Sequence, residues 1–196
     1  MTEVGMALSN KIDGERRPGA VGEPLPNVEI KLEDENGKEI TKEGEIGQIL
    51  IKGPQVFKEY QNLPEKTNES FKDGWFLTGD IAVMEDGYYR LLGRDSIDII
   101  KSGGYKISAL EIEDVLLKHK NVKECAVIAK DDNKWGEIVV AAIIPKNKAI
   151  SEDELQKWCS KYLSDYKIPR IIKFLDRLPK NSMGKVTKKE LRKLFT

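Results

Sequence analysis

One lysine near the end of the chain lies where it could bring a positive charge to an anionic reactant. Lys185 closes the segment Pro179-Lys180-Asn181-Ser182-Met183-Gly184-Lys185, and a short helical pattern begins soon after it, at Thr187. A lysine ammonium on such a loop could stabilise negative charge that develops on a reactant in a transition state. Glycine–lysine pairs before helices are nevertheless common, and the loop alone favours an ordinary solvated lysine.

A second candidate is a pair of glycines in the middle of the chain. Ser102-Gly103-Gly104-Tyr105 follows the strand-like Ile97-Asp98-Ile99-Ile100 and precedes a capped helix that begins near Ser108. Residues without a Cβ can adopt positive φ or let a ligand approach the backbone, and Lys101 and Lys106 add positive charge on either side. The alternative is an ordinary turn between a strand and a helix. The spacing fits neither the P-loop nor the dinucleotide-binding fingerprint.

Two further polar residues lie where strands are expected to end. Asp80 follows Thr78-Gly79 and could accept hydrogen bonds from ligand hydroxyls, although a turn or cap aspartate is the ordinary alternative. Arg94 follows the expected hairpin strand at 88–92, where its guanidinium could bind hydroxyl or phosphate oxygens. The alternative for Arg94 is a surface ion pair with Asp95 or Asp98.

The composition excludes several classes of function. The chain has 196 residues, 39% of them hydrophobic, and 33 basic residues balance 33 acidic ones, so no net charge draws it to a polyanion. Its longest apolar run, at 138–144, is far shorter than the roughly 20 residues of a membrane-spanning helix, and no signal peptide is recognisable. Cys125, Cys159 and the single histidine, His119, have no metal-ligand spacing, which favours reduced core thiols over a zinc site or a cysteine–histidine nucleophile.

The first half of the chain has the pattern of β structure. Apolar and polar residues alternate at 28–32 and 46–51, and the dipeptides Asn36-Gly37, Asp73-Gly74 and Asp86-Gly87 favour tight hairpin turns. Residues 64–71 read as a short helical or irregular excursion. A small sheet or barrel is therefore expected over residues 28–93.

The second half, from Ser96 onward, predicts a compact α+β domain. Three expected helices share a capping signature, in which a hydroxyl residue is followed three positions later by glutamate. These pairs are Ser108 with Glu111, Ser151 with Glu154, and Thr187 with Glu190. Apolar residues then recur at helical spacing, at Ile112, Val115 and Leu116; at Leu155, Trp158 and Tyr162; and at Leu191, Leu194 and Phe195.

Apolar runs at 124–129, 138–144 and 171–175 supply strands, giving the order β-α-β-β-α-β-α. We expect His119 near the exposed end of the first of these helices. The fold class is thus α+β, with a β-rich first part and a boundary near Arg94-Asp95.

Taken together, these segments resemble one family. Gly74-Trp75-Phe76-Leu77-Thr78-Gly79-Asp80, then Gly93-Arg94-Asp95, then Lys101-Ser102-Gly103-Gly104-Tyr105-Lys106, and finally the Lys185 loop occur in the order and spacing of the acyl-adenylate-forming (AMP-binding) enzymes. From Thr2 to Leu194 the chain resembles the C-terminal part of their acyl-CoA synthetases. The resemblance implies that residues 1–94 are a β-rich portion of the large AMP-binding domain and that residues 95–196 are the C-terminal lid domain.

The resemblance also implies a reaction and a set of site residues. A carboxylate and ATP would give acyl-AMP and pyrophosphate, and CoA would then displace AMP to give a thioester. Lys185 would contact the carboxylate and the α-phosphate, and Asp95 would be the hinge about which the lid rotates between the two steps. The remaining residues would bind substrates: Thr2 a phosphate oxygen, Glu3 the Mg²⁺ ion, Asp80 and Arg94 the ribose, and Lys101, Ser102, Gly103 and Gly104 the pantetheine of CoA.

The segments 1–10, 13–22 and 102–113 look most like those of malonyl-CoA synthetases, while medium-chain and aryl synthetases share the general motifs. The family's phosphate-binding loop and most of its adenine pocket have no counterpart in this chain. We therefore expect a fragment that is inactive alone, with residues 1–27 disordered or exchanged with a neighbouring molecule, and with the missing N-terminal domain as its partner. The expected location is cytoplasmic, with the mitochondrial matrix as an alternative for the full-length protein.

Two other functions remain open at this point. One is an adenylation domain that loads a carrier protein instead of CoA. The other is a non-catalytic module that binds a partner.

Overall fold

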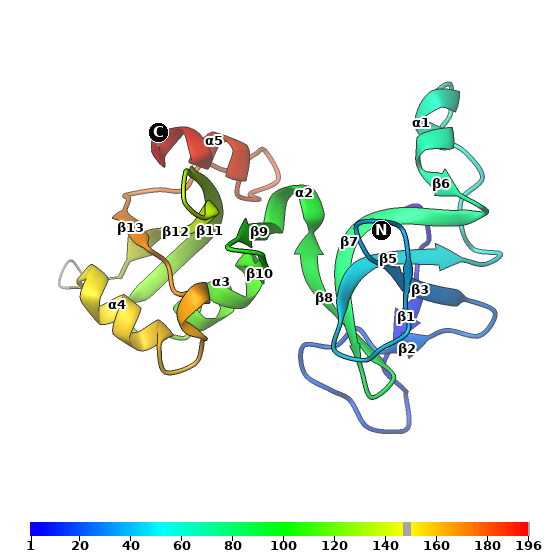
Figure 1. Cartoon of the computed structure of the whole chain (residues 1–196), viewed down its shortest axis with the longest axis horizontal. Coiled ribbons are helices and arrows are strands. Elements are labelled where there is room, and N and C mark those ends of the chain that lie inside the picture. The colour runs from blue at the N-terminus through cyan, green and yellow to red at the C-terminus, as the bar shows by residue number, and fades with distance from the viewer. Residues whose placement is uncertain (147–149, 196) are drawn as a thin grey trace. The chain divides into compact units, whose positions relative to one another are not determined.

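The computed structural model describes residues 1–146 and 150–195. The chain divides into two compact units, Met1–Asp95 and Ser96–Thr196 (Figure 1). No helix among the described residues is long and apolar enough to cross a membrane.

The first unit is built on an antiparallel six-stranded sheet. The sheet has the order β4-β3-β5-β7-β6, with β8 paired to β7, while β1 and β2 form a separate pair. Its elements are β1 (Leu8–Ser9), β2 (Glu23–Pro24), β3 (Glu29–Glu33), β4 (Glu39–Ile40), β5 (Ile46–Lys52), the short helix α1 (Pro64–Glu69), β6 (Phe71–Lys72), β7 (Trp75–Glu85) and β8 (Tyr88–Arg94).

The predicted turn dipeptides are confirmed. Asp73-Gly74 joins β6 to β7, and Asp86-Gly87 joins β7 to β8. All four of these residues have positive φ, between 49° and 81°, as a two-residue hairpin turn that matches the twist of the strands requires. Asn36-Gly37 lies in a longer turn between β3 (which ends at Glu33) and β4 (which begins at Glu39), where Gly37 has φ 76° but Asn36 does not have positive φ.

The N-terminal segment packs within the first unit, so the expectation that residues 1–27 are disordered is wrong, while their exchange with a neighbouring molecule stays a prediction. Val4 and Ala7 are buried in one apolar cluster with Ile51 and Phe76. The amide of Phe57 donates a hydrogen bond of 2.8 Å to the carbonyl of Glu3. The segment therefore has an apolar surface to cover within this unit.

The second unit is a five-stranded sheet with helices on both faces. Its elements are α2 (Asp95–Asp98), β9 (Ile99–Ser102), β10 (Tyr105–Ser108), α3 (Ala109–Leu117), β11 (Val122–Asp132), β12 (Gly136–Pro145), α4 (Glu152–Cys159), β13 (Ile171–Phe174), α5 (Lys188–Arg192) and two 3₁₀ turns, η1 (Asp165–Lys167) and η2 (Lys193–Phe195). The central strand β12 pairs with β11 along one edge and with β13 and β9 along the other.

Two separate apolar clusters lie on opposite faces of this sheet. Residues of α3 and α4 pack with Val139, Ala141 and Ile143 of β12. Leu191 and Phe195 pack with Val140 and the other alternate residues of the same strand. Figure 1 shows α5 on one side of β11 and β12, with α3 and α4 on the other.

The order of elements differs from the expected one near the start of this unit. Ile97-Asp98 belongs to the short helix α2 and not to a strand, and an additional strand, β10, precedes α3. The glycine pair therefore lies in the turn of the β9–β10 hairpin and not between a strand and a helix. Both missed elements are four residues long, too short to show a period in the sequence.

Two of the three predicted helix caps are present. The Ser108 hydroxyl accepts from the amide of Glu111, and the Ser151 hydroxyl accepts from the amide of Glu154. Thr187 precedes α5 without a side-chain capping bond, so the third prediction is wrong.

Three further expectations in this unit are corrected. α4 ends at Cys159, which leaves Tyr162 beyond the helix and 61% exposed, and Leu194 is also exposed. His119 follows α3 but is only 5% exposed, because its ring packs edge-on against Trp158 with centroids 5.1 Å apart.

Candidate functional site

Asp80 and Arg94 are brought together by the pairing of β7 with β8. The two residues are opposite each other in the ladder, and Arg94 Nε lies 3.3 Å from Asp80 Oδ1. The Arg94 side chain is 56% exposed, so the guanidinium remains accessible. A carboxylate and a guanidinium side by side can accept from hydroxyls and donate to phosphate oxygens.

The sequence predicted Asp80 at the end of a strand, but Asp80 lies within β7. Gly79 has φ 73°, and the register between β5 and β7 shifts at this point. The Thr78 hydroxyl donates to the carbonyl of Ile49 (2.7 Å) and accepts from the amide of Asp80 (3.0 Å). This irregularity interrupts the pairing of β7 with β5 near Asp80, which stays opposite Arg94 in the β7–β8 ladder, and Thr78 holds the Asp80 backbone in place.

Glu3 lies in the same unit and is held in its ionised form. Its Oε1 accepts a hydrogen bond of 3.0 Å from the Tyr60 hydroxyl. The pKa of Glu3 is lowered by a backbone hydrogen bond first, then by the Tyr60 hydroxyl, with smaller contributions from the N-terminus and Arg94. Nothing in the sequence singles out Tyr60, because it reads as one more aromatic residue beside Phe57.

Thr2 is exposed beside Glu3. Within residues 1–146 and 150–195, no group of three or more His, Cys, Asp or Glu side chains could hold a metal ion.

In the second unit, the glycine turn rests on the β11–β12 hairpin. Gly103 and Gly104 have φ 56° and 85°, and the amide of Gly103 donates to the carbonyl of Trp135 (2.9 Å). A Cβ on Gly103 would lie 2.9 Å from the Trp135 ring, whereas a Cβ on Gly104 would meet nothing within 4 Å. Gly103 is thus required for close packing, and Gly104 leaves open space at the tip of the turn.

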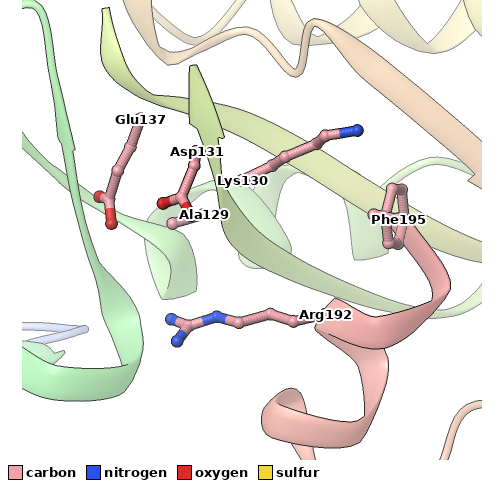
Figure 2. Close-up of a pocket in the computed structure, with 6 residues that line it drawn as sticks. All are labelled: Ala129, Lys130, Asp131, Glu137, Arg192 and Phe195. Atoms are coloured by element: carbon pink, nitrogen blue, oxygen red, sulfur yellow. The ribbon is translucent and has the colours of Figure 1, made fainter. Parts of the chain in front are cut away.

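The strand that enters this turn is held by Glu137, a residue that also lines a cavity. The amide of Lys101 donates to Glu137 Oε2 (2.6 Å), and Ser102 is buried. Figure 2 shows Asp131 and Glu137 extending from neighbouring strands toward a cavity of about 260 Å³, with Arg192 extending from α5 toward the same space. Glu137 therefore holds the edge of β9 just before the glycines.

The Lys185 loop is ordered by the side chain of Asn181. Asn181 Oδ1 accepts from the amides of Met183 (3.0 Å) and Lys185 (2.9 Å), and the amide of Asn181 donates to the carbonyl of Lys185 (2.9 Å). Gly184 allows the turn with φ 79°, and a β-bridge joins Lys180 to Val186. The loop therefore presents an exposed Lys185 side chain on a fixed backbone.

Sequence reasoning also missed Lys188, the first residue of α5. Its ammonium lies 2.7 Å from Asp98 Oδ1 and 2.9 Å from Glu113 Oε1, and its side chain is only 10% exposed. A buried lysine looks like any surface lysine in the sequence, so no signal could have identified it.

The structure thus places the predicted site residues in three groups. Glu3, Asp80 and Arg94 belong to the first unit, whereas the turn at 101–104 and the Lys185 loop belong to the second. Asp95 begins α2 at the division between the two units.

Comparisons with known proteins agree over the whole chain. Residues 1–61 match the AMP-binding enzyme family, and residues 111–185 match the AMP-binding enzyme C-terminal domain. A malonate–CoA ligase of Arabidopsis thaliana is 50% identical over 98% of this chain, which covers 33% of that protein. A mitochondrial malonate–CoA ligase of Bos taurus is 43% identical over 97% of the chain and is covered to 36%.

A solved structure shows the same likeness. The ATP-bound crystal structure of MatB from Rhodopseudomonas palustris superposes with a TM-score of 0.86 at 41% identity, over 100% of this chain and 39% of that one. The chain therefore spans little more than a third of the length of the relatives that it matches. On the strength of both family matches and these relatives, the chain belongs to the AMP-binding enzymes, and residues 111–185 are their C-terminal domain.

Proposed function

We propose that the chain is the C-terminal part of an ATP-dependent carboxylate–CoA ligase that acts on malonate or a close relative. The observation that carries the proposal is the Lys185 loop, which offers one exposed ammonium on a backbone fixed by Asn181. Preorganised charge of this kind stabilises negative charge in a transition state without the cost of reorganisation. Identity of 50% to a malonate–CoA ligase supports the choice of acid.

In the first step, a carboxylate attacks the α-phosphate of ATP and pyrophosphate leaves. Lys185 supplies positive charge between the two anionic reactants, and Asp80 accepts hydrogen bonds from the ribose hydroxyls with Arg94 beside it. The ion pair between Asp80 and Arg94 supports these roles, because each side chain keeps the other in an orientation suited to a hydroxyl-rich ligand.

Glu3 and Thr2 are assigned to the phosphates and their Mg²⁺ ion. An ionised carboxylate is the oxygen ligand that Mg²⁺ prefers, and the lowered pKa of Glu3, due first to a backbone hydrogen bond, keeps it ionised. When bound with ATP, the ion would neutralise phosphate charge. Thr2 donates its hydroxyl to a phosphate oxygen.

In the second step, the thiol of CoA attacks the acyl carbon and AMP leaves. The turn at Lys101, Ser102, Gly103 and Gly104 lies along the pantetheine, and the open space at Gly104 supports this role. We assign residues 1–94 to the large domain and residues 95–196 to the lid, which rotates about Asp95 to exchange the Lys185 loop for the glycine turn. Two catalytic faces on one small domain suit such a rotation.

The complete protein, with ATP, Mg²⁺ and a panel of carboxylic acids, provides the test. We expect pyrophosphate exchange that depends on malonate and a CoA thioester as the final product, with no turnover by the 196-residue chain alone. Transfer to a carrier protein but not to CoA would identify the other kind of adenylation domain. Absence of exchange with every acid would leave a non-catalytic partner-binding module and would overturn the proposal.

The proposed location is the cytoplasm or the mitochondrial matrix. The mitochondrial malonate–CoA ligase of Bos taurus supports the second of these. Fractionation of cells that produce the complete protein would distinguish them.

A further inference from the structure

The segment before the glycine turn and the segment after the Lys185 loop are tied together by one buried ammonium. Lys188 Nζ bonds to Asp98 Oδ1 at 2.7 Å and to Glu113 Oε1 at 2.9 Å. The exposed fractions of the three side chains are 10% for Lys188, 14% for Asp98 and 15% for Glu113. Ion pairs with so little exposure are screened less than those at a surface, and removal of one partner leaves the other charges poorly solvated.

Asp98 and Lys188 lie next to the two segments that carry the predicted site residues of this unit. Asp98 ends α2 and directly precedes β9, the strand that runs into Ser102 and the two glycines. Lys188 begins α5 directly after Thr187, which supplies no capping bond to that helix. The side chain of Lys188 therefore holds the start of α5, and with it the end of the Lys185 loop.

The third member of the tie connects it to the core of the unit. Glu113 lies on α3, and its Oε1 also accepts a hydrogen bond of 2.7 Å from the amide of Val127 on β11. One carboxylate oxygen thus joins the helix, the sheet and Lys188. Loss of the ammonium would leave two largely buried carboxylates without the cation that both of them contact, which is costly.

A cavity lies beside the tie, between α2 and the Lys185 loop. Its volume is about 480 Å³, and it is lined by Ser96 and Ile97 from α2 and by Asn181 and Val186 from the loop. The Lys188 ammonium bridges the two sides at the edge of this cavity.

We infer that Lys188 is a positioning residue, which fixes the Lys185 loop to the chain that leads into the glycine turn so that both move as one body. The inference rests on the proposed function for its catalytic meaning. The tie itself is a property of the 196-residue chain and can be measured there. Lys188 contacts no reactant in this proposal; it acts through Lys185.

The first experiment measures amide hydrogen exchange in the 196-residue chain. Lys188→Met should speed exchange of the Met183 and Lys185 amides by about tenfold or more, the scale expected when a charge-assisted contact that holds a loop is lost. Lys189→Met, the same change one residue later on an exposed side chain, is the matched control and should leave these amides unchanged. Unchanged exchange in Lys188→Met would overturn the inference, whatever the chain catalyses.

The second experiment measures the two half-reactions in the complete ligase. Lys188→Met should slow adenylation by about 10- to 100-fold, the loss typical of misplacement near 1 Å, and should leave thioester formation from supplied acyl-AMP within about threefold. Lys188→Arg should restore adenylation. Simple destabilisation would lower both half-reactions together and would contradict a positioning role.

A double variant guards against a fold that is merely unstable. Lys188→Met combined with Asp98→Asn removes one of the unmatched buried charges and should recover stability, but the tie remains absent. Adenylation should stay low in this variant, whereas recovery to the wild-type rate would overturn the inference. If the unaltered complete protein shows no pyrophosphate exchange with any acid, the proposed function fails. The amide hydrogen exchange rates of the 196-residue chain still decide the role of Lys188.

Discussion

At the scale of single residues, the site consists of side chains whose orientation is set by neighbours of ordinary appearance. Asn181 orders the loop that carries Lys185, Tyr60 holds Glu3, and Thr78 holds the backbone of Asp80. Each of these contacts consists of one or two hydrogen bonds made by a single side chain. They determine whether the charged groups keep one geometry.

The sharpest consequence at this scale concerns Lys185. In the complete ligase, Lys185→Ala should reduce adenylation by about 100-fold or more, because charge stabilisation of the transition state is lost, and should spare thioester formation from supplied acyl-AMP. Separate assays of pyrophosphate release and thioester production measure the two steps. Lys193→Ala is a suitable control, since Lys193 is exposed and pairs with Glu190. Equal loss in both steps would refute the assignment of Lys185.

Asp80 should act on nucleotide binding. Asp80→Asn keeps the shape of the side chain but removes the charge that pairs with Arg94, so we expect KM for ATP to rise by about tenfold, the scale of one hydrogen bond to a charged group. Steady-state kinetics at saturating carboxylate measures this effect. A lower kcat with an unchanged KM would show that Asp80 does not bind the nucleotide.

At the scale of elements, the helix caps and the hairpins differ in how far they could be predicted. Two-residue turns depend on local backbone conformation alone, which is why Asp73-Gly74 and Asp86-Gly87 were correctly placed. The cap at Thr187 failed because the start of α5 is held by a residue distant in sequence, through Lys188 and Asp98. A local sequence pattern cannot reveal that a long-range ion pair takes the place of a helix cap.

The pairing of Asp80 with Arg94 shows the same limit. Counting back from the Asp86-Gly87 turn would place Asp80 opposite Gly93. The register shift between Ile81 and Ala82 moves it opposite Arg94. The family and both charged residues could be predicted from the sequence, but their contact depends on one bulge.

The caps predict a graded loss of stability. Ser108→Ala and Ser151→Ala each remove a bond to a helix amide and should lower the free energy of unfolding by about 1 kcal/mol. Thr187→Ala removes no such bond and should cost only a few tenths of that amount. Urea unfolding of the three variants provides the comparison, and an equal cost for Thr187→Ala would show that its hydroxyl does cap α5 in solution.

At the scale of the whole molecule, each unit has a core of its own and can be followed by its own probe. Trp75 lies in the first unit, and Trp135 and Trp158 lie in the second. Both cysteines also belong to the second unit, where burial raises the pKa of Cys125 to about 12 and that of Cys159 to about 11. Both thiols are therefore protonated at neutral pH and should report unfolding of that unit by becoming open to alkylation.

Acid should weaken the first unit through Glu33. Burial by itself raises the pKa of Glu33, but its bonds to Lys31 and Lys72, both 2.8 Å, outweigh this and hold the pKa below its ordinary value of 4.5. The stabilisation is complete above that value, where the carboxyl is ionised in both states. It is lost as the pH falls through the lower pKa of the folded state, because the unfolded chain takes up the proton first.

Glu33→Gln should therefore lower stability at neutral pH and reduce the further loss on acidification. Thermal unfolding followed at Trp75, near Lys31, between neutral pH and about pH 3 measures both effects. Glu29→Gln is the control, since Glu29 is exposed and pairs only loosely with Lys52 at 3.5 Å. An acid response in Glu33→Gln equal to that of the parent chain would contradict the role of this ion pair.

The composition of the central strand β12 bears on the tendency of the chain to aggregate. Its run at 138–144 is apolar on both faces, with no charge and no proline, and this is the composition of segments that assemble into cross-β aggregates when they are uncovered. One of its faces is covered by Leu191 and Phe195 at the very end of the chain. Truncation after residue 187 should therefore yield a protein that precipitates or scatters light on concentration, and the last turns of the chain act as its protection against self-association.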